Sequence, residues 1–393
     1  MGVFHRLAGV ISGRTLEERL TQLERTVRKI GEAGRDRATT TDARLQEISR
    51  AVADQPTAKD LRELRQALRG VAAPAPAQTL FETLERIASS DRPVLIGPWT
   101  GEVGFELLYW IPFLEWARAR WQLQPEREIV VSRGGVASWY RQSADRYIDI
   151  LSLFSPDEFR VAVSEEKRKH RQPGAFDARV TEAIGRRQRL EEIDTLHPGM
   201  MFRAFAPYWS DEAGYALIDQ FTRPRLMEAP TVTVPVSLPS DYVAVRFYFS
   251  ECFPATQQNR DFVRHVVASL AERHAVVLLN PGVMVDEHTD WLPQSGDRIL
   301  TIGDGLAADR NLEVQSAVIA GARAFVGTYG GYAYLAPLYR VPAVAFYSQQ
   351  SFKLCHLHAA QRAFSHVGAA ELLPIDVAQA GVLQAALAAL VST

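Results

Sequence analysis

The chain has 393 residues, which exceeds one typical domain and predicts two or three. Apolar residues make up 47% and charged residues 23%, and the formal net charge is −2, so the composition is that of a globular protein and indicates no nucleic-acid partner. Two cysteines exclude a disulfide framework and a cysteine-based zinc cluster, and no apolar run approaches the roughly 20 residues of a membrane span.

Residues 1–71 are predicted to form a helical, partly coiled-coil arm. Its apolar residues Leu16, Leu20, Leu23, Val27 and Ile30 follow heptad spacing. The seam predicts association with a second copy of the chain, or an arm folded onto its own catalytic domain. Residues 72–90 are predicted to be a linker, which is extended over the Pro/Ala stretch 72–78 and helical over 79–89.

Residues 91–232 alternate buried strands with helices, which predicts a parallel sheet with crossover helices in a first Rossmann-like domain. Residues 164–195 are polar and are expected to form an exposed helical excursion. The expected strands are Pro93–Gly97, Glu128–Ser132 and Phe159–Val163, and the expected helix is Phe105–Arg120.

A Pro-rich stretch, 229–240, predicts the crossing into a second domain over 236–393. Strands and helices alternate there again, which predicts a second doubly wound half. The expected strands are Tyr242–Phe249, Ala275–Asn280, Ile299–Ile302, Ala324–Gly327 and Pro342–Tyr347, and the expected helices are Asn259–His274, Asn311–Ala322, Tyr332–Tyr339 and Val377–Val391.

The first candidate site is the turn that follows the first strand, over 97–106. In open α/β sheets ligands bind beyond the carboxyl ends of the strands, so an acid here is suited to be the general base of a group transfer. Glu102 is the predicted base and Glu106 is held in reserve. The alternative is that Glu102 only favours the helix N-terminus and that Glu106 forms an internal ion pair.

Arg246 is the second candidate because it interrupts an apolar strand. A buried guanidinium needs a partner, and it can bind two phosphate oxygens at once. A structural ion pair is the alternative. Ser250, in the following loop, is predicted to add a donor.

The third candidate is the turn Gly327–Tyr332 between a strand and a helix, where free N–H groups favour a phosphate. Its predicted donor-binding residues are Gly327, Thr328, Tyr329, Gly330 and Gly331, and the alternative is a tight packing turn. Glu313 is predicted to bind a ribose hydroxyl or to favour a helix N-terminus. His356 and His358 lack a carboxylate cluster, so no metal site and no cofactor are predicted.

These segments together resemble bacterial GT-B glycosyltransferases, and heptosyltransferases in particular. Gly101 and Glu102 stand at the family's Gly-acid position, and Ile111 and Pro112 follow in the helix. The stretch 316–346 is similar to the family's second-domain signature. Two departures are Glu in place of the usual Asp at the base, and Thr328–Tyr332 in place of Asp-Ser-Gly and a His.

The resemblance implies two Rossmann-like domains facing a cleft, a nucleotide-diphosphate sugar donor, and metal-independent transfer with inversion to a glycan or lipid-linked acceptor. It therefore predicts an enzyme of surface polysaccharide synthesis, cytoplasmic or peripheral at the inner face of the membrane. The strand with Arg246 also resembles that of fucosyltransferases, which admits a GDP-sugar. The alternatives are a nucleotide-sugar epimerase or hydrolase on the same fold, and a non-catalytic scaffold.

Overall fold

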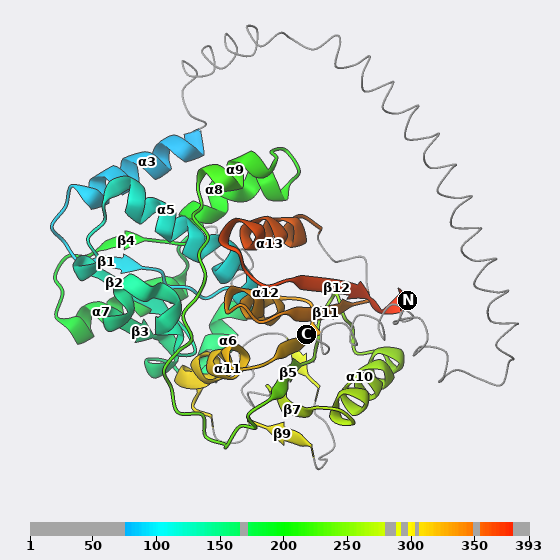
Figure 1. The fold of residues 1–393 in the computed structure, drawn as a ribbon. Coiled ribbons are helices and arrows are strands. Elements are labelled where there is room, and N and C mark those ends of the chain that lie inside the picture. Colours follow the sequence, from blue (N-terminus) through cyan, green and yellow to red (C-terminus); the bar gives the residue numbers. More distant parts are fainter. Residues whose placement is uncertain are drawn as a thin grey trace, which may run out of the picture. The chain divides into compact units, whose positions relative to one another are not determined.

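The structure is a computed structural model that describes residues 75–165, 172–279, 288–291, 298–302, 306–348 and 354–379. The arm predicted over 1–71 and most of the helix predicted over Val377–Val391 lie outside these residues. Both sheets belong to one compact unit, Ala73–Thr393 (Figure 1). None of the described helices has the length and hydropathy needed to cross a bilayer.

The first half contains a parallel sheet, sheet A. Its strands run in the order β3 (Tyr147–Asp149), β2 (Glu128–Ser132), β1 (Val94–Ile96) and β4 (Asp194–Leu196). The first two expected strands are confirmed. The third is wrong, because Phe159–Val163 lies in the helix α6 (Pro156–Glu165). There Phe159 is fully buried but Val161 is 48% exposed, which is a helical pattern of burial.

The second half contains a six-stranded parallel sheet, sheet B. Its strands run in the order β12 (Leu372–Asp376), β11 (Ala343–Tyr347), β10 (Ala324–Thr328), β5 (Tyr242–Arg246), β7 (Ala275–Leu278) and β9 (Ile299–Thr301). Counted along the chain within this half, that is the strand order 3-2-1-4-5-6 typical of doubly wound folds. The predicted parallel α/β architecture is therefore confirmed for both halves.

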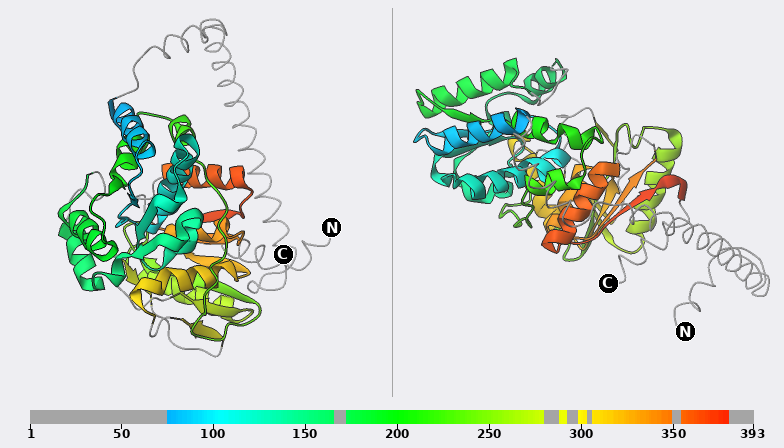
Figure 2. Two further views of the ribbon diagram at one scale, coloured as in Figure 1. Left: turned by 90° about the vertical axis from the view of Figure 1, so that its left-hand side faces the viewer. Right: turned by 90° about the horizontal axis from the view of Figure 1, so that it is seen from above.

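Helices cover both faces of each sheet. On sheet B, α10 (Gln257–Ala271) packs on one face, and α11 (Asn311–Ala320), α12 (Gly331–Leu338) and α13 (Leu354–Val367) lie on the other side (Figures 1 and 2). On sheet A, α6 and α7 (Ala175–Gln188) pack on one face. The other face of sheet A is covered by α3 (Ala75–Ala88), α5 (Ile111–Trp121) and α8 (Gly199–Trp209), with α9 (Tyr215–Gln220) beside them.

The expected extended linker over 72–78 is overlapped by α3, which begins at Ala75. This helix buries Leu80, Leu84 and Ile87 in the main core, so it is part of the globular body. The crossing between the halves, 222–241, has neither helix nor strand, as its prolines predict.

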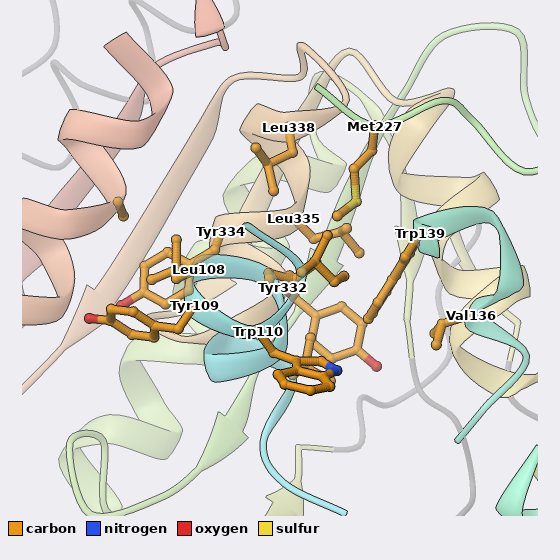
Figure 3. Packing of buried hydrophobic residues seen from close by; sticks show 14 of the residues in the cluster. Leu108, Tyr109, Trp110, Val136, Trp139, Met227, Tyr332, Tyr334, Leu335 and Leu338 are labelled. Atoms are coloured by element: carbon orange, nitrogen blue, oxygen red, sulfur yellow. The ribbon is translucent and has the colours of Figure 1, made fainter. Parts of the chain in front are cut away.

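The two halves share one hydrophobic core. Leu108, Tyr109 and Trp110 of the first half pack against α12 of the second (Figure 3). A Cβ atom on Gly331 would lie 2.8 Å from the Cβ atom of Val103, so only glycine lets α12 approach this closely. Side chains therefore fill this contact between the two halves.

Candidate functional site at the two strand-order reversals

Strand order reverses once in each sheet, and the strongest candidate residues lie at these two points. In sheet A the reversal falls between β1 and β4, and in sheet B between β5 and β10. In sheet B the connections that leave this point lead into α10 and α12 on opposite faces, which makes it the usual ligand position in open α/β sheets, whereas in sheet A the helices that follow, α5 and α8, cover the same face. Glu102 follows β1, Arg246 ends β5, and Gly330 follows β10.

Glu102 begins the helical segment that follows β1. Its backbone is extended, and its side chain is exposed and makes no capping hydrogen bond to α4 (Val103–Phe105). Glu102 is therefore the N-cap residue of α4 without a capping hydrogen bond. Because Val103 touches Gly331, Glu102 stands where the N-termini of two helical segments meet. Both N-termini carry partial positive charge and favour an anion.

Arg246 is held from three sides at the end of β5. Its guanidinium donates hydrogen bonds to Gln315 at 2.9 Å and to Asp290 at 3.2 Å, and it lies 4.1 Å from the ring centre of Tyr332. Burial by itself lowers the pKa of Arg246, but Tyr332, Asp290 and Tyr248 raise it above the ordinary value. The Nε–H group is buried and makes no hydrogen bond to any described residue. A fixed cation with a spare donor is suited to a phosphate.

Tyr248 connects these two residues across the halves. Its ring centre lies 5.8 Å from the Arg246 guanidinium carbon, and its hydroxyl donates to the Tyr329 carbonyl at 3.2 Å. Burial raises the pKa of the Tyr248 hydroxyl, and the nearby charge of Glu102 adds to that rise. Tyr248 therefore lies beside Arg246 and within electrostatic reach of Glu102.

The turn Gly327–Gly331 is tightly packed rather than open. Thr328 is 1% exposed, and its hydroxyl donates to the Tyr248 carbonyl at 2.8 Å. The Tyr329 hydroxyl accepts a hydrogen bond from Tyr334. A side chain at Gly327 would collide with the Arg246 carbonyl, and one at Gly330 with the Tyr248 hydroxyl. These contacts match the alternative of a packing turn, which positions Arg246 and Tyr248.

Ser250 and Glu313 lie in different places. Ser250 is beside Tyr248, where its hydroxyl is 3.3 Å from the thiol of Cys252. Glu313 is on α11, where its N–H donates to the Gly134 carbonyl at 2.9 Å and its carboxylate pairs with Arg310. The Ser250 hydroxyl therefore pairs within its own loop, and Glu313 lies at the contact between the halves.

Glu106 is fully buried behind the site. Its Oε1 atom accepts hydrogen bonds from Ser132 at 2.7 Å and from Tyr140 at 2.5 Å. Burial raises its pKa to about 7, and the cation of Arg133 opposes that rise. A catalytic base must contact the substrate, so the fully buried Glu106 does not fit the role of reserve base.

We expect the buried carboxyl of Glu106 to make stability depend on pH. Its pKa in the folded state is higher than its ordinary value of 4.5, so its contribution is fully present below pH 4.5 and is lost as pH rises to about 7. The Glu106→Gln variant, neutral at every pH, should gain up to roughly 3 kcal/mol in unfolding free energy relative to wild type over this interval. Urea titrations at pH 4.5 to 8 measure this difference.

The matched control for that titration is Glu212→Gln, because the Glu212 side chain is exposed and lacks the burial that causes the effect. A difference between wild type and Glu106→Gln that stays constant with pH would contradict the prediction.

His356 and His358 lie on α13. On a helix the two side chains point away from each other. His356 Nδ1 is 2.8 Å from the Tyr109 hydroxyl, and His358 packs against Tyr215. In the part of the chain that the structure describes, no three His, Cys, Asp or Glu side chains form a group suited to a metal ion.

Asp290 and Gln315 hold Arg246 but were not selected from the sequence, and Tyr332, which also contacts Arg246, was selected only as the end of the turn Gly327–Tyr332. Gln315 carried a usable signal, because it is a polar residue in an apolar helix. The Gly134–Gly135 pair also stands out in the sequence, because it closely follows the buried strand β2. Both glycines have positive φ, near 80°.

Neither a protein-family model nor a curated protein matches the chain. Among solved structures, it is similar to the iron-containing dodecameric glycosyltransferase TibC from enterotoxigenic E. coli H10407, with 18% identity and a TM-score of 0.37. That match covers 65% of this chain, which spans 58% of the length of TibC.

Two further solved structures are similar. The family 9 glycosyl transferase from Veillonella parvula DSM 2008 has 12% identity and a TM-score of 0.40, and covers 76% of this chain and 89% of its own. The ADP-heptose lipopolysaccharide heptosyltransferase II from E. coli has 13% identity and a TM-score of 0.37. That match covers 72% of this chain and 90% of the heptosyltransferase. These neighbours are heptosyltransferases and glycosyltransferases, the kinds of protein that the sequence resembles.

Proposed function

We propose that this chain is a GT-B-type inverting glycosyltransferase, which moves a sugar from a nucleotide-diphosphate sugar to a glycan or lipid-linked acceptor in surface polysaccharide synthesis. The observation that carries the proposal is that Glu102 follows β1 and Arg246 ends β5, each at the strand-order reversal of its sheet. An exposed acid and a fixed cation are the two groups that such a transfer needs.

Glu102 accepts the proton of the acceptor hydroxyl. The acceptor oxygen then forms a bond to the anomeric carbon while the bond from that carbon to the diphosphate oxygen breaks, which inverts the configuration. Arg246 stabilises the negative charge that develops on the leaving diphosphate, because its guanidinium is already oriented by Asp290, Gln315 and Tyr332. We propose that Ser250, in the loop that follows, adds a hydroxyl donor.

Binding of a nucleotide sugar is expected to raise the thermal stability of the protein. At a ligand concentration 100 times Kd, the native state gains about 2.7 kcal/mol. The experiment is a thermal-shift panel of UDP-, GDP-, ADP- and CMP-sugars on wild type and on Arg246→Lys, which keeps the charge but loses the planar fork. We expect a shift with one nucleotide class and a loss of most of it in the variant.

Arg264→Lys is the matched control, because this arginine is 60% exposed on α10 and pairs only with Asp261 among the described residues. No shift with any nucleotide sugar, from a sample that unfolds cooperatively, would overturn the proposal. Turnover of the bound donor without any acceptor would instead indicate the epimerase or hydrolase alternative.

A further inference from the structure

Glu106 is a buried carboxyl that the proposed mechanism does not use, and it stands at one end of a continuous chain of buried contacts. Its Oε1 atom accepts hydrogen bonds from Ser132 at 2.7 Å and from Tyr140 at 2.5 Å. Both donors belong to residues 132–140, which we call the bridging segment. The Oε2 atom is buried and makes no hydrogen bond to any described residue, so a proton can reside there without breaking either bond.

The bridging segment carries this chain of contacts into the second half. Trp139 directly precedes Tyr140 and lies in the shared core (Figure 3). Its Nε1–H group donates to the hydroxyl of Ser316, on α11, at 3.2 Å. Trp139, Tyr140 and Ser316 are all buried, and a close-packed interior transmits displacement because it leaves no free space. A movement of Tyr140 should therefore reach α11 through Trp139.

The same end of α11 holds Arg246. Gln315 directly precedes Ser316, is 0% exposed, and accepts a hydrogen bond from the Arg246 guanidinium at 2.9 Å. The bridging segment contacts this helix a second time, because the Gly134 carbonyl accepts from the Glu313 N–H group at 2.9 Å. Two contacts of the bridging segment therefore fix the turn of α11 that orients Arg246.

The charge of Glu106 determines how firmly the bridging segment is held. Burial raises the pKa of Glu106 to about 7, while Arg133, Tyr140 and Ser132 lower it and the charge of Asp149 raises it. A hydrogen bond to an ionised carboxylate is roughly twice as strong as one between neutral groups. The bridging segment is therefore held most firmly when Glu106 is ionised, and less firmly once it takes up a proton.

The arginines and tyrosines around Glu106 keep their charge state while it titrates. Burial raises the pKa of Tyr140 and of Tyr147, so both hydroxyls keep their protons in the neutral range. Arg133 acts on Glu106 and Arg118 acts on Tyr140, and a guanidinium is not deprotonated in proteins.

Asp149 is a second carboxyl that contacts the bridging segment. Its Oδ2 atom accepts from the Gly135 N–H group at 2.7 Å and from the Tyr147 hydroxyl at 2.8 Å. Burial raises the pKa of Asp149 to about 6; these hydrogen bonds lower it, and the charge of Asp309 raises it. Asp149 is therefore expected to titrate at lower pH than Glu106, so that the two can be told apart.

We propose that Glu106 positions Arg246 in a pH-dependent way: its ionised carboxylate holds the bridging segment, which holds α11 and the Gln315 amide that orients the guanidinium. The inference rests on the proposed function, in which Arg246 binds the donor diphosphate, and it adds a control of that binding by pH. Donor affinity should rise by roughly three- to ten-fold as Glu106 loses its proton. By linkage, a bound donor favours the ionised form of Glu106 by the same factor.

The first measurement tests the contact between Glu106 and the bridging segment without any ligand. The full chain is labelled with 5-fluorotryptophan, and the fluorine signal of Trp139 is assigned by its loss in Trp139→Phe. Between pH 5.5 and 8.5 we expect this signal to shift with a midpoint near pH 7 in wild type and in the exposed control Glu212→Gln. That step should vanish in Glu106→Gln, and a step at lower pH that remains there belongs to Asp149.

The second measurement is the calorimetric affinity for UDP-glucose, GDP-mannose and ADP-glucose over the same pH range. Their diphosphates are diesters of constant charge there, so a change in affinity must come from the protein. We expect the affinity of the probe that binds to rise through pH 7 in wild type and Glu212→Gln and to stay level in Glu106→Gln. Tyr140→Phe, which removes one of the two donors but leaves Glu106 able to titrate, should show a smaller rise.

Each part of the inference can fail separately. A Trp139 signal with no step near pH 7, or with the same step in Glu106→Gln, would disprove the link from Glu106 to the bridging segment. Affinity that is constant with pH in wild type, that falls as pH rises, or that changes equally in Glu106→Gln would disprove the control of Arg246. If none of the three probes binds at any pH, the proposed function falls and the control of binding falls with it, whereas the fluorine titration still decides the first link.

Discussion

Replacing Glu102 by glutamine is expected to lower the rate of sugar transfer by about 10²- to 10⁴-fold. The amide cannot accept the proton that the acceptor hydroxyl must lose, while its size and hydrogen-bonding reach are nearly unchanged. The side chain is exposed and makes no capping hydrogen bond, so the fold should not depend on its charge. Transfer from the donor identified by thermal shift to an array of glycans measures the effect.

Glu102→Asp is the informative companion, because it retains the carboxylate and shortens its reach by one methylene. We expect activity between those of wild type and Glu102→Gln, and an unchanged nucleotide-sugar shift in all three proteins. Full transfer activity in Glu102→Gln would remove Glu102 from the mechanism. Loss of nucleotide binding in the same variant would show that the carboxylate acts on the donor.

Much of the fold could be predicted because each buried strand is short, apolar and bounded by turn residues. Tyr242–Arg246, Ala275–Leu278 and Ala324–Thr328 were all located from this pattern. The alternation of such strands with helices then predicts parallel sheets. Strand order was not available from the sequence, because it depends on which strands pair.

The errors have physical causes. Phe159–Val163 is apolar enough for a strand, but Pro156 and two acids precede it, which is the start of a helix. Two strands of sheet A were missed, Tyr147–Asp149 and Asp194–Leu196, and in each an aspartate serves side-chain hydrogen bonds. A strand of three residues carries too little periodicity to detect.

Among the candidate site residues, too, some could be predicted from the sequence and others could not. Glu102 and Arg246 could be selected because each stands out locally, the first in a glycine-rich turn and the second in an apolar strand. Asp290, Gln315 and Tyr332 are 44, 69 and 86 residues from Arg246 along the chain, and only the fold brings them to it. Likewise, whether Gly331 faces a phosphate or Val103 depends on how the halves pack.

The two halves are also joined by hydrogen bonds. Trp139 of the first half donates to Ser316 at 3.2 Å and to Tyr339 at 3.1 Å in the second half. Separating the halves would expose these groups together with Trp110 and Leu335 of the shared core.

The second large effect is a loss of stability, and it is expected in a buried ion-pair network around Arg118. Arg118 is 6% exposed and donates to both oxygens of Glu128, at 3.0 and 3.1 Å, while it also pairs with Glu115. Arg225 joins Glu115 to the Trp139 carbonyl, which ties the crossing segment to the contact between the halves. We expect Arg118→Ala to lower the unfolding free energy by about 3–5 kcal/mol, because Glu128, 1% exposed, would be left as an uncompensated buried charge.

Two controls separate that cause from the loss of packing. Arg118→Met with Glu128→Leu removes both charges and should recover most of the loss, since apolar replacement of a buried pair is often neutral. Arg186→Ala breaks an exposed pair with Glu182 and should cost less than about 1 kcal/mol. Urea unfolding followed by tryptophan fluorescence suits the comparison, because all seven tryptophans lie between residues 99 and 291. Arg118→Ala could instead prove no more destabilising than Arg186→Ala. The buried network would then not be what fixes the crossing segment, and the shared aromatic core alone would have to hold the site residues in place.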